Sequence, residues 1–508
     1  MVYSLQVQPD ALVQFFNLIF SSKYLLVNSF FQASVSTLGA VLVGIPVAFV
    51  IARRNFPFKQ AVKSLFLIPF VFPSILVVIS FILVFGNNGW INQFLQNSFG
   101  FQVPVNFLYG FQGIILAHIF YNFPLVAKFV STAWESSDKT MKEAAQTLGA
   151  NRIQTFFSIT VFQLLPSILA SASLVFIYSF MSFAIVLSFG GIQFSTFEVE
   201  IFRQIVQNLN LGTASLLAVF QFFVLVLVSG VYFYFSKKFI IFEKPNSEKP
   251  KNINLLSAQG IVEVSILLLA ILLVVFPFLS LILFAVTDPN TGAFTLKAFE
   301  KIFFAQQSSL AGTTPVLAIG YTLFFALAAS VLAVFLGLLA VLNQTKTRFT
   351  SLIVSGSLAV STITLGFGYL LGFGSGFFWL IILGHAVFVF PFSFRLLQNA
   401  ISKIDPDELA AARVLGANRW RVLKFIQWPL MKKSVLVSLA FGFAVSLGEL
   451  GFVLLMYDGI YPTMSVYVYR MLSHFDLGAA AGMGVVLIAL SFFCFYFIEK
   501  HSSKVQVF

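Results

Sequence analysis

Unbroken apolar runs of about 20 residues dominate this chain, and they restrict its fold more than any other feature of the sequence. A run of about that length is what an α-helix needs to cross a bilayer. A membrane β-barrel would instead show alternating segments of about ten residues. Hydrophobic residues make up 59% of the chain and charged residues only 9%. The sequence therefore predicts an all-α integral membrane protein.

Eleven membrane spans are expected, five in the first half of the chain and six in the second. The segment at 11–27 is interrupted by polar residues and is expected to lie as an amphipathic segment on the outer face. The first span of the second half, 261–286, has no counterpart in the first half. The expected spans are 29–52, 62–85, 111–131, 163–189, 213–236, 261–286, 320–343, 352–373, 377–398, 431–456 and 478–498.

The distribution of basic residues predicts the orientation of these spans. When alternate connectors are assigned to opposite sides, 25 of the 30 Lys and Arg residues fall on one side, and the other side keeps Lys23, Arg203, Lys297, Lys301 and Arg470. Cytoplasmic loops are enriched in Lys and Arg. We therefore expect a multi-pass protein of the cytoplasmic (inner) membrane with its N-terminus outside and its C-terminus in the cytoplasm. This topology explains the net charge of +12, so no nucleic-acid partner is expected.

Two further observations limit the chemistry of the chain. Its one cysteine, Cys494, lies in the last apolar run, so no intrachain disulfide or thiolate metal site is expected. Residues 1–10 contain no Lys or Arg, which argues against a cleaved signal peptide.

A short motif occurs twice and divides the chain into two halves. Residues 148–152, Leu-Gly-Ala-Asn-Arg, recur unchanged at 415–419, which is 267 residues later. The same distance separates His118 from His385 and Arg203 from Arg470. These landmarks have the same orientation, so the sequence predicts a parallel repeat with a pseudo-twofold axis along the membrane normal.

Upstream of these landmarks the distance between matched residues grows. Ser29 and Thr322 lie 293 residues apart, so the first half holds about 26 extra residues, which we expect near 86–110. The expected domains are a first half at 1–240 with a polar loop near 138–160, a cytoplasmic linker at 241–258, and a second half at 259–508 with its loop near 405–427.

Each copy of the motif is predicted to end a short helix. Asp138 and Asp405 can cap the two helices, and Pro406 suits the first position of the second. Gly149 and Gly416 are expected to end them in the left-handed conformation. Such a helix could lie on lipid headgroups. Its letter-for-letter recurrence favours a helix that fits a groove in another protein.

The two loops resemble the "EAA" loop in the permease subunits of binding-protein-dependent ABC importers. The first copy carries Glu143-Ala144-Ala145, Gly149 and Pro166. The second carries Ala411-Ala412, Gly416 and Pro429. The resemblance covers nearly the whole chain and implies a fused two-half permease of the type I fold. Ala410 stands where that family has Glu, which Glu408 could replace, and Phe162 stands where the first copy would have proline.

The resemblance also implies partners. In that family the loop is a coupling helix that docks on a cytoplasmic ATPase. We therefore expect two copies of an ABC ATPase, an extracytoplasmic solute-binding protein, a small-molecule solute and membrane lipid. The residues expected to contact the ATPase are Glu143, Ala144, Ala145, Leu148, Gly149, Arg152, Glu408, Ala411, Ala412, Leu415, Gly416 and Arg419.

Enzyme activity is not expected in this chain. No Gly-Lys dipeptide occurs, so a Walker A phosphate loop is excluded and ATP must bind to a partner. No catalytic residue, metal or cofactor is expected. A secondary transporter is an alternative, but such proteins typically invert one repeat or break spans at the midplane, and the sequence indicates neither. A receptor or structural membrane protein would leave the doubled motif unexplained.

Two segments bear on the solute. Residues 182–187, with Gly190-Gly191 and 198–203, resemble fused thiamine permeases. Residues 446–451 resemble that group and also the fused ferric-iron permeases. The resemblance favours thiamine, with ferric iron as the alternative and a polyamine or phosphonate as further possibilities.

Glu449 is the most notable ionisable residue within an apolar run. Such a carboxylate is costly and by default faces a cavity, where it would suit a cationic solute. It could instead be satisfied by a neighbouring helix. The matched residue of the first half is Ser182. The expected pathway residues are Tyr178, Ser182, Phe183, Ser446 and Glu449.

Aromatic and histidine side chains complete the candidates. Tyr178, Phe180 and Phe183 could stack on a heteroaromatic ring. For His118 and His385 we expect interhelical hydrogen bonds rather than contact with a ligand.

Overall fold

The structure, a computed structural model, describes residues 23–502 apart from 67–68, 70–71, 101–104, 192–193, 239–249, 255, 289–290, 305–312 and 343–359. Ten helices in the described part are long and apolar enough to cross a membrane. The eleventh expected span, 352–373, is described only from residue 360, where Thr362–Phe373 is helical. The all-α membrane fold predicted from the sequence is confirmed.

The first half is a bundle in which α2 packs against α7 and α10. Polar residues are buried along α2, where Ser29, Gln32 and Ser36 face the bundle. Its elements are α2 (Lys23–Arg53), β1 (Arg54–Asn55), α3 (Lys59–Leu65), α5 (Ser74–Phe85), α6 (Trp90–Phe99), α7 (Phe111–Glu135), α8 (Lys139–Thr147), α9 (Arg152–Thr155), a π-helical turn at Phe156–Thr160, α10 (Val161–Phe180), α11 (Ala184–Phe189), α12 (Phe197–Val206) and α13 (Leu211–Lys238).

The second half has the matching bundle, in which α16 packs against α19 and α22. Its elements are β2 (Lys251–Asn252), α14 (Ala258–Ala285), α15 (Lys297–Phe303), α16 (Pro315–Leu342), α18 (Thr362–Phe373), α19 (Phe378–Ile401), α20 (Pro406–Val414), α21 (Arg419–Val422), a π-helical turn at Leu423–Gln427, α22 (Trp428–Leu447), α23 (Gly451–Met456), α24 (Met464–Ser473) and α25 (Leu477–Ser502).

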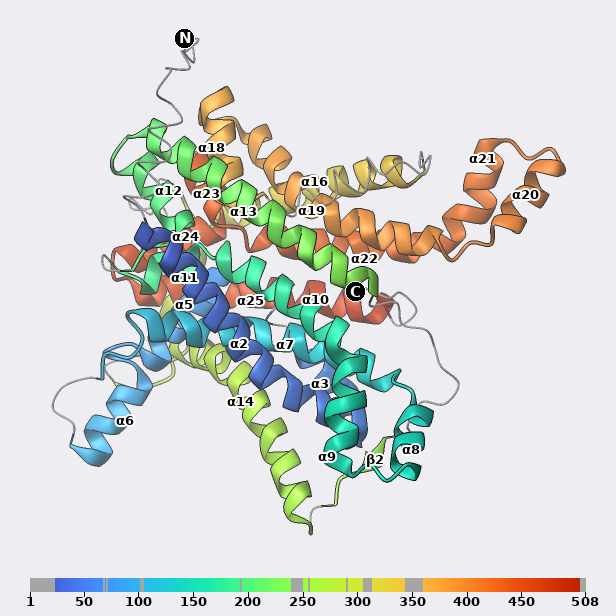
Figure 1. The fold of residues 1–508 in the computed structure, drawn as a ribbon. Helices are drawn as coiled ribbons and strands as arrows, with labels where there is room; N and C mark the ends of the chain where they lie inside the picture. Colours follow the sequence, from blue (N-terminus) through green and yellow to red (C-terminus); the bar gives the residue numbers. More distant parts are fainter. Residues whose placement is uncertain are drawn as a thin grey trace.

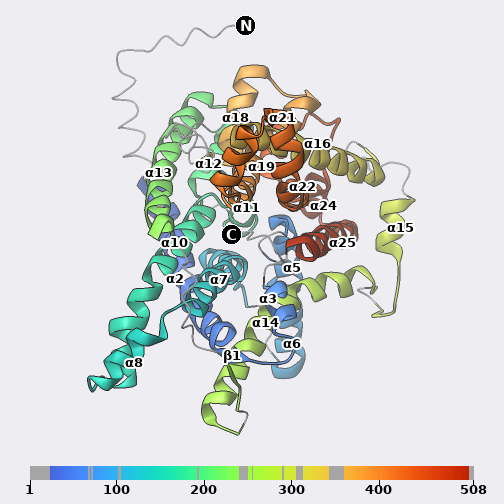
Figure 2. The same cartoon turned by 90° about the vertical axis from the view of Figure 1, so that its right-hand side faces the viewer.

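The duplication extends to the boundaries of the elements. From α8 to α12 every element of the first half recurs in the second, shifted by 267 residues and with the same length. Figure 1 shows α8 and α9 at the same end of the molecule as α20 and α21. Each pair forms a projection, which we call an arm: the first arm is α8 with α9, and the second is α20 with α21. Figure 2, turned by 90°, shows the two pairs well apart. The arrangement agrees with a parallel rather than an inverted repeat.

The extra residues of the first half lie mostly where they were expected. The distance between matched residues falls from 293 at Ser29 and Thr322 to 288 at Ser74 and Thr362, and it is 267 from α7 onward. The larger step therefore lies between α5 and α7. This segment contains α6, which projects away from the bundle in Figure 1.

Three of the expected spans are wrong as continuous helices. The span expected at 62–85 contains α3, which ends at Leu65, and α5, which begins only after Pro73. Pro73 has no N–H for a helical hydrogen bond and is in an extended conformation. Of the segment expected on the outer face, 11–22 lies outside the described residues and 23–27 begins α2.

The other two interruptions lie at matched positions. The span expected at 163–189 is α10 followed by α11, and the span expected at 431–456 is α22 followed by α23. Hydropathy did not show these breaks, because only three residues separate the helices in each half and the apolar residues on both sides form one long run. In the second half the break lies against the other half, since a Cβ on Gly448 would come within 2.9 Å of the Cα of Pro73. The expectation that no span is broken is therefore wrong.

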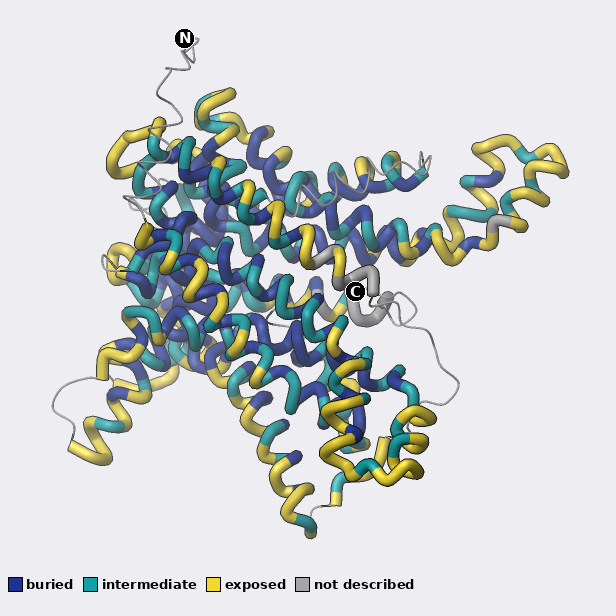
Figure 3. Tube along the Cα trace, in the orientation of Figure 1, coloured by how far each residue is buried: buried dark blue, intermediate teal, exposed yellow. Residues whose placement is uncertain are grey.

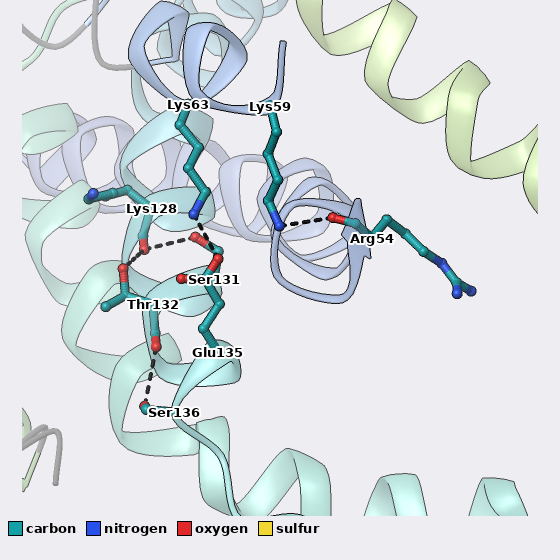
Figure 4. A network of polar contacts seen from close by, with 8 residues as sticks. All are labelled: Arg54, Lys59, Lys63, Lys128, Ser131, Thr132, Glu135 and Ser136. Atoms are coloured by element: carbon teal, nitrogen blue, oxygen red, sulfur yellow. Dashed lines mark hydrogen bonds and ion pairs between the residues drawn. The ribbon is translucent and has the colours of Figure 1, made fainter. Parts of the chain in front are cut away.

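Helix α14 joins the two halves at the polar end of the first bundle. It packs against α5 and α25, and strand β2 just before it pairs in parallel with β1. Nearby, Lys63 forms an ion pair with Glu135 at 2.7 Å, and Lys59 donates a hydrogen bond of 2.8 Å to the Arg54 carbonyl (Figure 4). The two side-chain contacts tie α3 to α7 and to β1, which directly follows α2, and the β1–β2 pairing joins this region to the second half.

Candidate functional site

Both copies of the repeated motif end a capped helix, as predicted. The carboxylate of Asp138 accepts a hydrogen bond of 2.9 Å from the Thr140 amide, and Asp405 accepts one of the same length from the Asp407 amide. Gly149 and Gly416 follow the helices with φ angles of 90° and 81°. These values lie in the left-handed region that glycine adopts without strain.

The expected coupling residues lie on the surface of both arms. The side chains of Leu148 and Leu415 are 89% and 87% exposed. Figure 3 shows α8 and α20 as mainly exposed tube at the ends of the arms. Ala145 and Ala412 are half-buried and the other ten expected residues are exposed. Each arm thus exposes a leucine at an equivalent place.

The two copies differ in charge. In the first, Lys139 forms an ion pair with Glu143 at 2.6 Å, one turn apart on α8. The second has Ala410 at the position of Glu143, and Glu408 lies one residue after Asp407 in the first turn of α20. A glutamate in the first turn interacts favourably with the helix dipole.

A cavity of about 300 Å³ lies between the two halves. Its walls come from α7, α10 and α11 of the first half and from α19, α22 and α23 of the second, together with the starts of α5 and α18. Four of the five expected pathway residues line it, namely Tyr178, Ser182, Phe183 and Glu449. The breaks after α10 and α22 place backbone and polar side chains, rather than continuous helix, against this space.

The fifth expected residue, Ser446, lies behind the cavity wall. It is buried and its hydroxyl is 2.5 Å from Nδ1 of His385. Phe180, expected as a stacking residue, is also not part of the wall that the structure describes. It is fully buried and packs edge-on against Phe30 at a ring distance of 5.3 Å. That expectation is wrong because Phe180 faces the core between α2 and α12.

Glu449 has two kinds of neighbours. Its Oε1 accepts a hydrogen bond of 3.0 Å from the Phe452 amide, and Oε2 accepts one of 3.2 Å from the Val453 amide. These amides belong to the first turn of α23, so the carboxylate caps that helix. It also lines the cavity, with Nε2 of His385 3.8 Å from Oε2. The helix end holds the carboxylate in place at the cavity wall.

The two matched histidines form interhelical hydrogen bonds, as predicted. Nδ1 of His118 is 3.0 Å from the hydroxyl of Ser36 on α2, and Nδ1 of His385 bonds Ser446 on α22. His118 also lines the cavity. His118 therefore combines the predicted hydrogen bond with a place on the cavity wall.

Comparison with known proteins finds a family match in the first half of the chain and relatives that align with nearly all of it. Residues 40–241 match the family described as the binding-protein-dependent transport system inner membrane component. The chain is 26% identical over 499 residues to the thiamine transport system permease protein ThiP of Escherichia coli (strain K12), covering 93% of this chain and 88% of that protein. The family model thus matches the first half of the chain, and the similarity to the ThiP permease extends over both halves.

Two further relatives agree with this similarity. The thiamine transport system permease protein ThiP of Haemophilus influenzae is 24% identical over 503 residues, covering 94% of this chain and 88% of that protein. A putative 2-aminoethylphosphonate transport system permease protein of Salmonella typhi is 28% identical over 208 residues, covering 41% of this chain and 71% of that protein. The description of the matched family is that of an inner membrane component of a transport system that depends on a binding protein.

Sequence reasoning missed several polar residues inside the helical bundle. Asn122 and Tyr121 line the cavity. Glu198 is fully buried on α12 and bonds the side chain of Gln221. Asn122 carried a usable signal, because it is an amide within an apolar run and its matched residue, Val389, is apolar.

Proposed function

We propose that this chain is the permease of an ATP-driven importer that carries thiamine across the cytoplasmic membrane. The proposal draws the substrate from relatives named as thiamine permeases, which align with 90% or more of the chain. The observation that carries it is the position of Glu449 on the wall of the cavity between the halves. Thiamine has a permanent positive charge, and a carboxylate at the cavity wall complements a cation.

In the proposed mechanism the two arms transmit the movement of the ATPase to the membrane helices. A solute-binding protein delivers thiamine to the outer face, and two copies of an ABC ATPase grip α8 and α20. Closure of the ATPase pair on ATP would pull both arms together and rock the halves about the cavity. The exposed Leu148 and Leu415 support this arrangement, because an apolar side chain on the tip of an arm is suited to a groove in a partner.

We further assign the orientation, the domains and the absence of a cofactor in the chain itself. The arms and the C-terminus lie in the cytoplasm, and ATP binds only to the partner. The first half covers 1–240 and the second 259–508. The linker at 241–258 lies partly outside the described residues, and its described end includes β2.

Uptake into proteoliposomes tests the proposal. The permease is reconstituted with its ATPase, and the binding protein is supplied on the outside with labelled thiamine or with ferric iron. ATP-dependent uptake of thiamine is the expected result. Uptake of ferric iron instead would establish the alternative substrate, and thiamine uptake driven by an ion gradient without ATP would indicate a secondary transporter.

A substitution at Glu449 tests the carboxylate. Glu449→Gln keeps an oxygen for the amides of α23 but removes the charge, so thiamine uptake should fall at least tenfold. Glu300→Gln, at an exposed position on α15, is the control and should leave uptake unchanged. Equal uptake by wild type and Glu449→Gln would contradict the role of Glu449.

A further inference from the structure

Two buried polar atoms on the first-half wall of the cavity have no hydrogen-bond partner within the described structure. They are Nε2 of His118 and Oδ1 of Asn122. Both residues are 2% exposed and line the cavity. They lie four residues apart on α7, so their side chains share one face of the helix. A buried polar atom without a hydrogen-bond partner costs free energy. Two such atoms beside a cavity therefore indicate that a ligand supplies their partners.

The remaining polar atoms of these two side chains are already bonded, which fixes their orientation. Nδ1 of His118 pairs with the Ser36 hydroxyl at 3.0 Å. Nδ2 of Asn122 donates to the His118 carbonyl at 3.0 Å and contacts the Ser179 hydroxyl at 3.4 Å. When the Ser36 hydroxyl donates to Nδ1, the imidazole proton lies on Nε2. The wall then presents one donor, Nε2–H, and one acceptor, Oδ1.

The second half shows that the scaffold does not require this pair. At the position matched to Asn122 it has Val389, and at the position matched to Ser36 it has Ala329. Both are buried in the corresponding bundle. The helices pack without the amide and the hydroxyl there, so these groups have a purpose other than folding.

We propose that His118 and Asn122 together determine substrate specificity. They recognise, through hydrogen bonds, a ring nitrogen next to an exocyclic amino group on a planar heterocycle. Nε2–H of His118 donates to the ring nitrogen, and Oδ1 of Asn122 accepts from the amino group. The aminopyrimidine ring of thiamine has this edge, and its positively charged thiazolium ring faces Glu449 across the same cavity. Ser36 acts as a positioning residue that sets the imidazole. This inference rests on the proposed function and adds the recognition of the neutral ring.

The test compares thiamine with the analogue in which oxygen replaces the amino group, whose edge has the donor and acceptor reversed. Both are offered to the reconstituted complex with the same binding protein, and the ratio of their uptake rates is measured. Because the binding protein is unchanged, a change in the ratio between permease variants reports on the permease. Asn122→Val should reduce the preference for thiamine roughly threefold to tenfold, the value of about one neutral hydrogen bond.

A second variant protects the test against a folding defect. Ser36→Ala installs the residue of the second half and should lower the same ratio by a smaller factor. Its matched control is Ser330→Ala on α16, where the hydroxyl bonds the Ala326 carbonyl at 2.6 Å. The control should keep the wild-type ratio.

Three outcomes are decisive. A lower ratio in Asn122→Val and Ser36→Ala, with the control unchanged, supports the pair. Equal loss of both substrates with a constant ratio would mean that the residues are structural, and would overturn the inference while leaving thiamine transport intact. Failure of the wild-type complex to take up thiamine would overturn the proposed function itself and the inference with it.

Discussion

The guanidinium of Arg54 lies 2.6 Å from the carboxylate of Glu263 and forms a largely buried ion pair between β1, which directly follows α2, and the start of α14. These two residues are 209 positions apart and belong to different halves. Gln259, one turn before Glu263, also donates to the carboxylate at 2.9 Å. The contact fixes the first helix of the second half to the first half, at the point where β1 and β2 pair.

Removing this carboxylate should destabilise the protein. Glu263→Ala leaves Arg54 buried without its partner, which typically costs about 3–5 kcal/mol. We expect a clear fall in the thermal unfolding temperature of the purified permease in detergent. The control is Glu135→Ala, which removes the partner of Lys63 (Figure 4). This ion pair is more exposed than the Arg54–Glu263 pair, so its loss should cost about 1 kcal/mol or less. Equal shifts for the two variants would show that the Arg54–Glu263 pair does not hold the halves together.

The glycines that end α8 and α20 should be required for coupling. A valine at Gly149 or Gly416 must adopt a positive φ angle, which is strained for a β-branched residue. An added Cβ meets nothing within 4 Å at either position, so the damage should be confined to the end of the helix. We expect loss of co-purified ATPase and of uptake, with insertion into the membrane retained.

A glycine on a different surface provides the control for this effect. Gly459 also has a positive φ angle, 102°, and an added Cβ there meets nothing within 4 Å. Gly459→Val imposes the same kind of strain away from the arms and should keep the ATPase bound. Retained coupling in both Gly149→Val and Gly416→Val would remove the docking role of the arms.

Close approach of helices should make the first bundle less tolerant of added volume than the second. A Cβ on Gly44 would come within 2.7 Å of the Val126 Cβ and 3.0 Å of the Phe123 carbonyl oxygen. At the matched Gly337 the nearest atom would be the flexible end of Leu397, at 3.2 Å. Gly44→Ala should therefore destabilise by about 1–3 kcal/mol, and Gly337→Ala by less. Thermal unfolding measures both, and a larger loss for Gly337→Ala would contradict this packing difference.

Labelling of single cysteines can establish which side of the membrane the arms face. The one native cysteine, Cys494, is buried, and its replacement by serine removes background labelling by a membrane-impermeant maleimide. A cysteine at Leu415 should react only from the cytoplasmic side. One at Phe475, which is 91% exposed between α24 and α25, should react from the outside. Labelling of both positions from the same side would overturn the proposed topology.

Much of the fold could be predicted because its signals are local. The length of the apolar runs gives helices that cross a bilayer, and Asp138 and Gly149 mark the ends of α8 through hydrogen bonds and a backbone angle within a few residues of each. Because the motif recurs at 415–419, the end of α20 could be predicted in the same way. The matched positions of His118 and His385 likewise predicted hydrogen bonds between helices, which the structure has.

The sequence by itself thus determined that the chain is a duplicated helical membrane protein with two capped, polar helices at equivalent places. Only the tertiary structure decided where the spans break, which polar atoms of α7 lack partners, and which half supplies each wall of the cavity. Those features depend on contacts between residues far apart in the chain, such as Gly448 against Pro73 and Asn122 against Ser179. Hydropathy and motif spacing depend only on residues that are close to one another in the sequence. The breaks and the cavity depend on contacts between residues of the two halves.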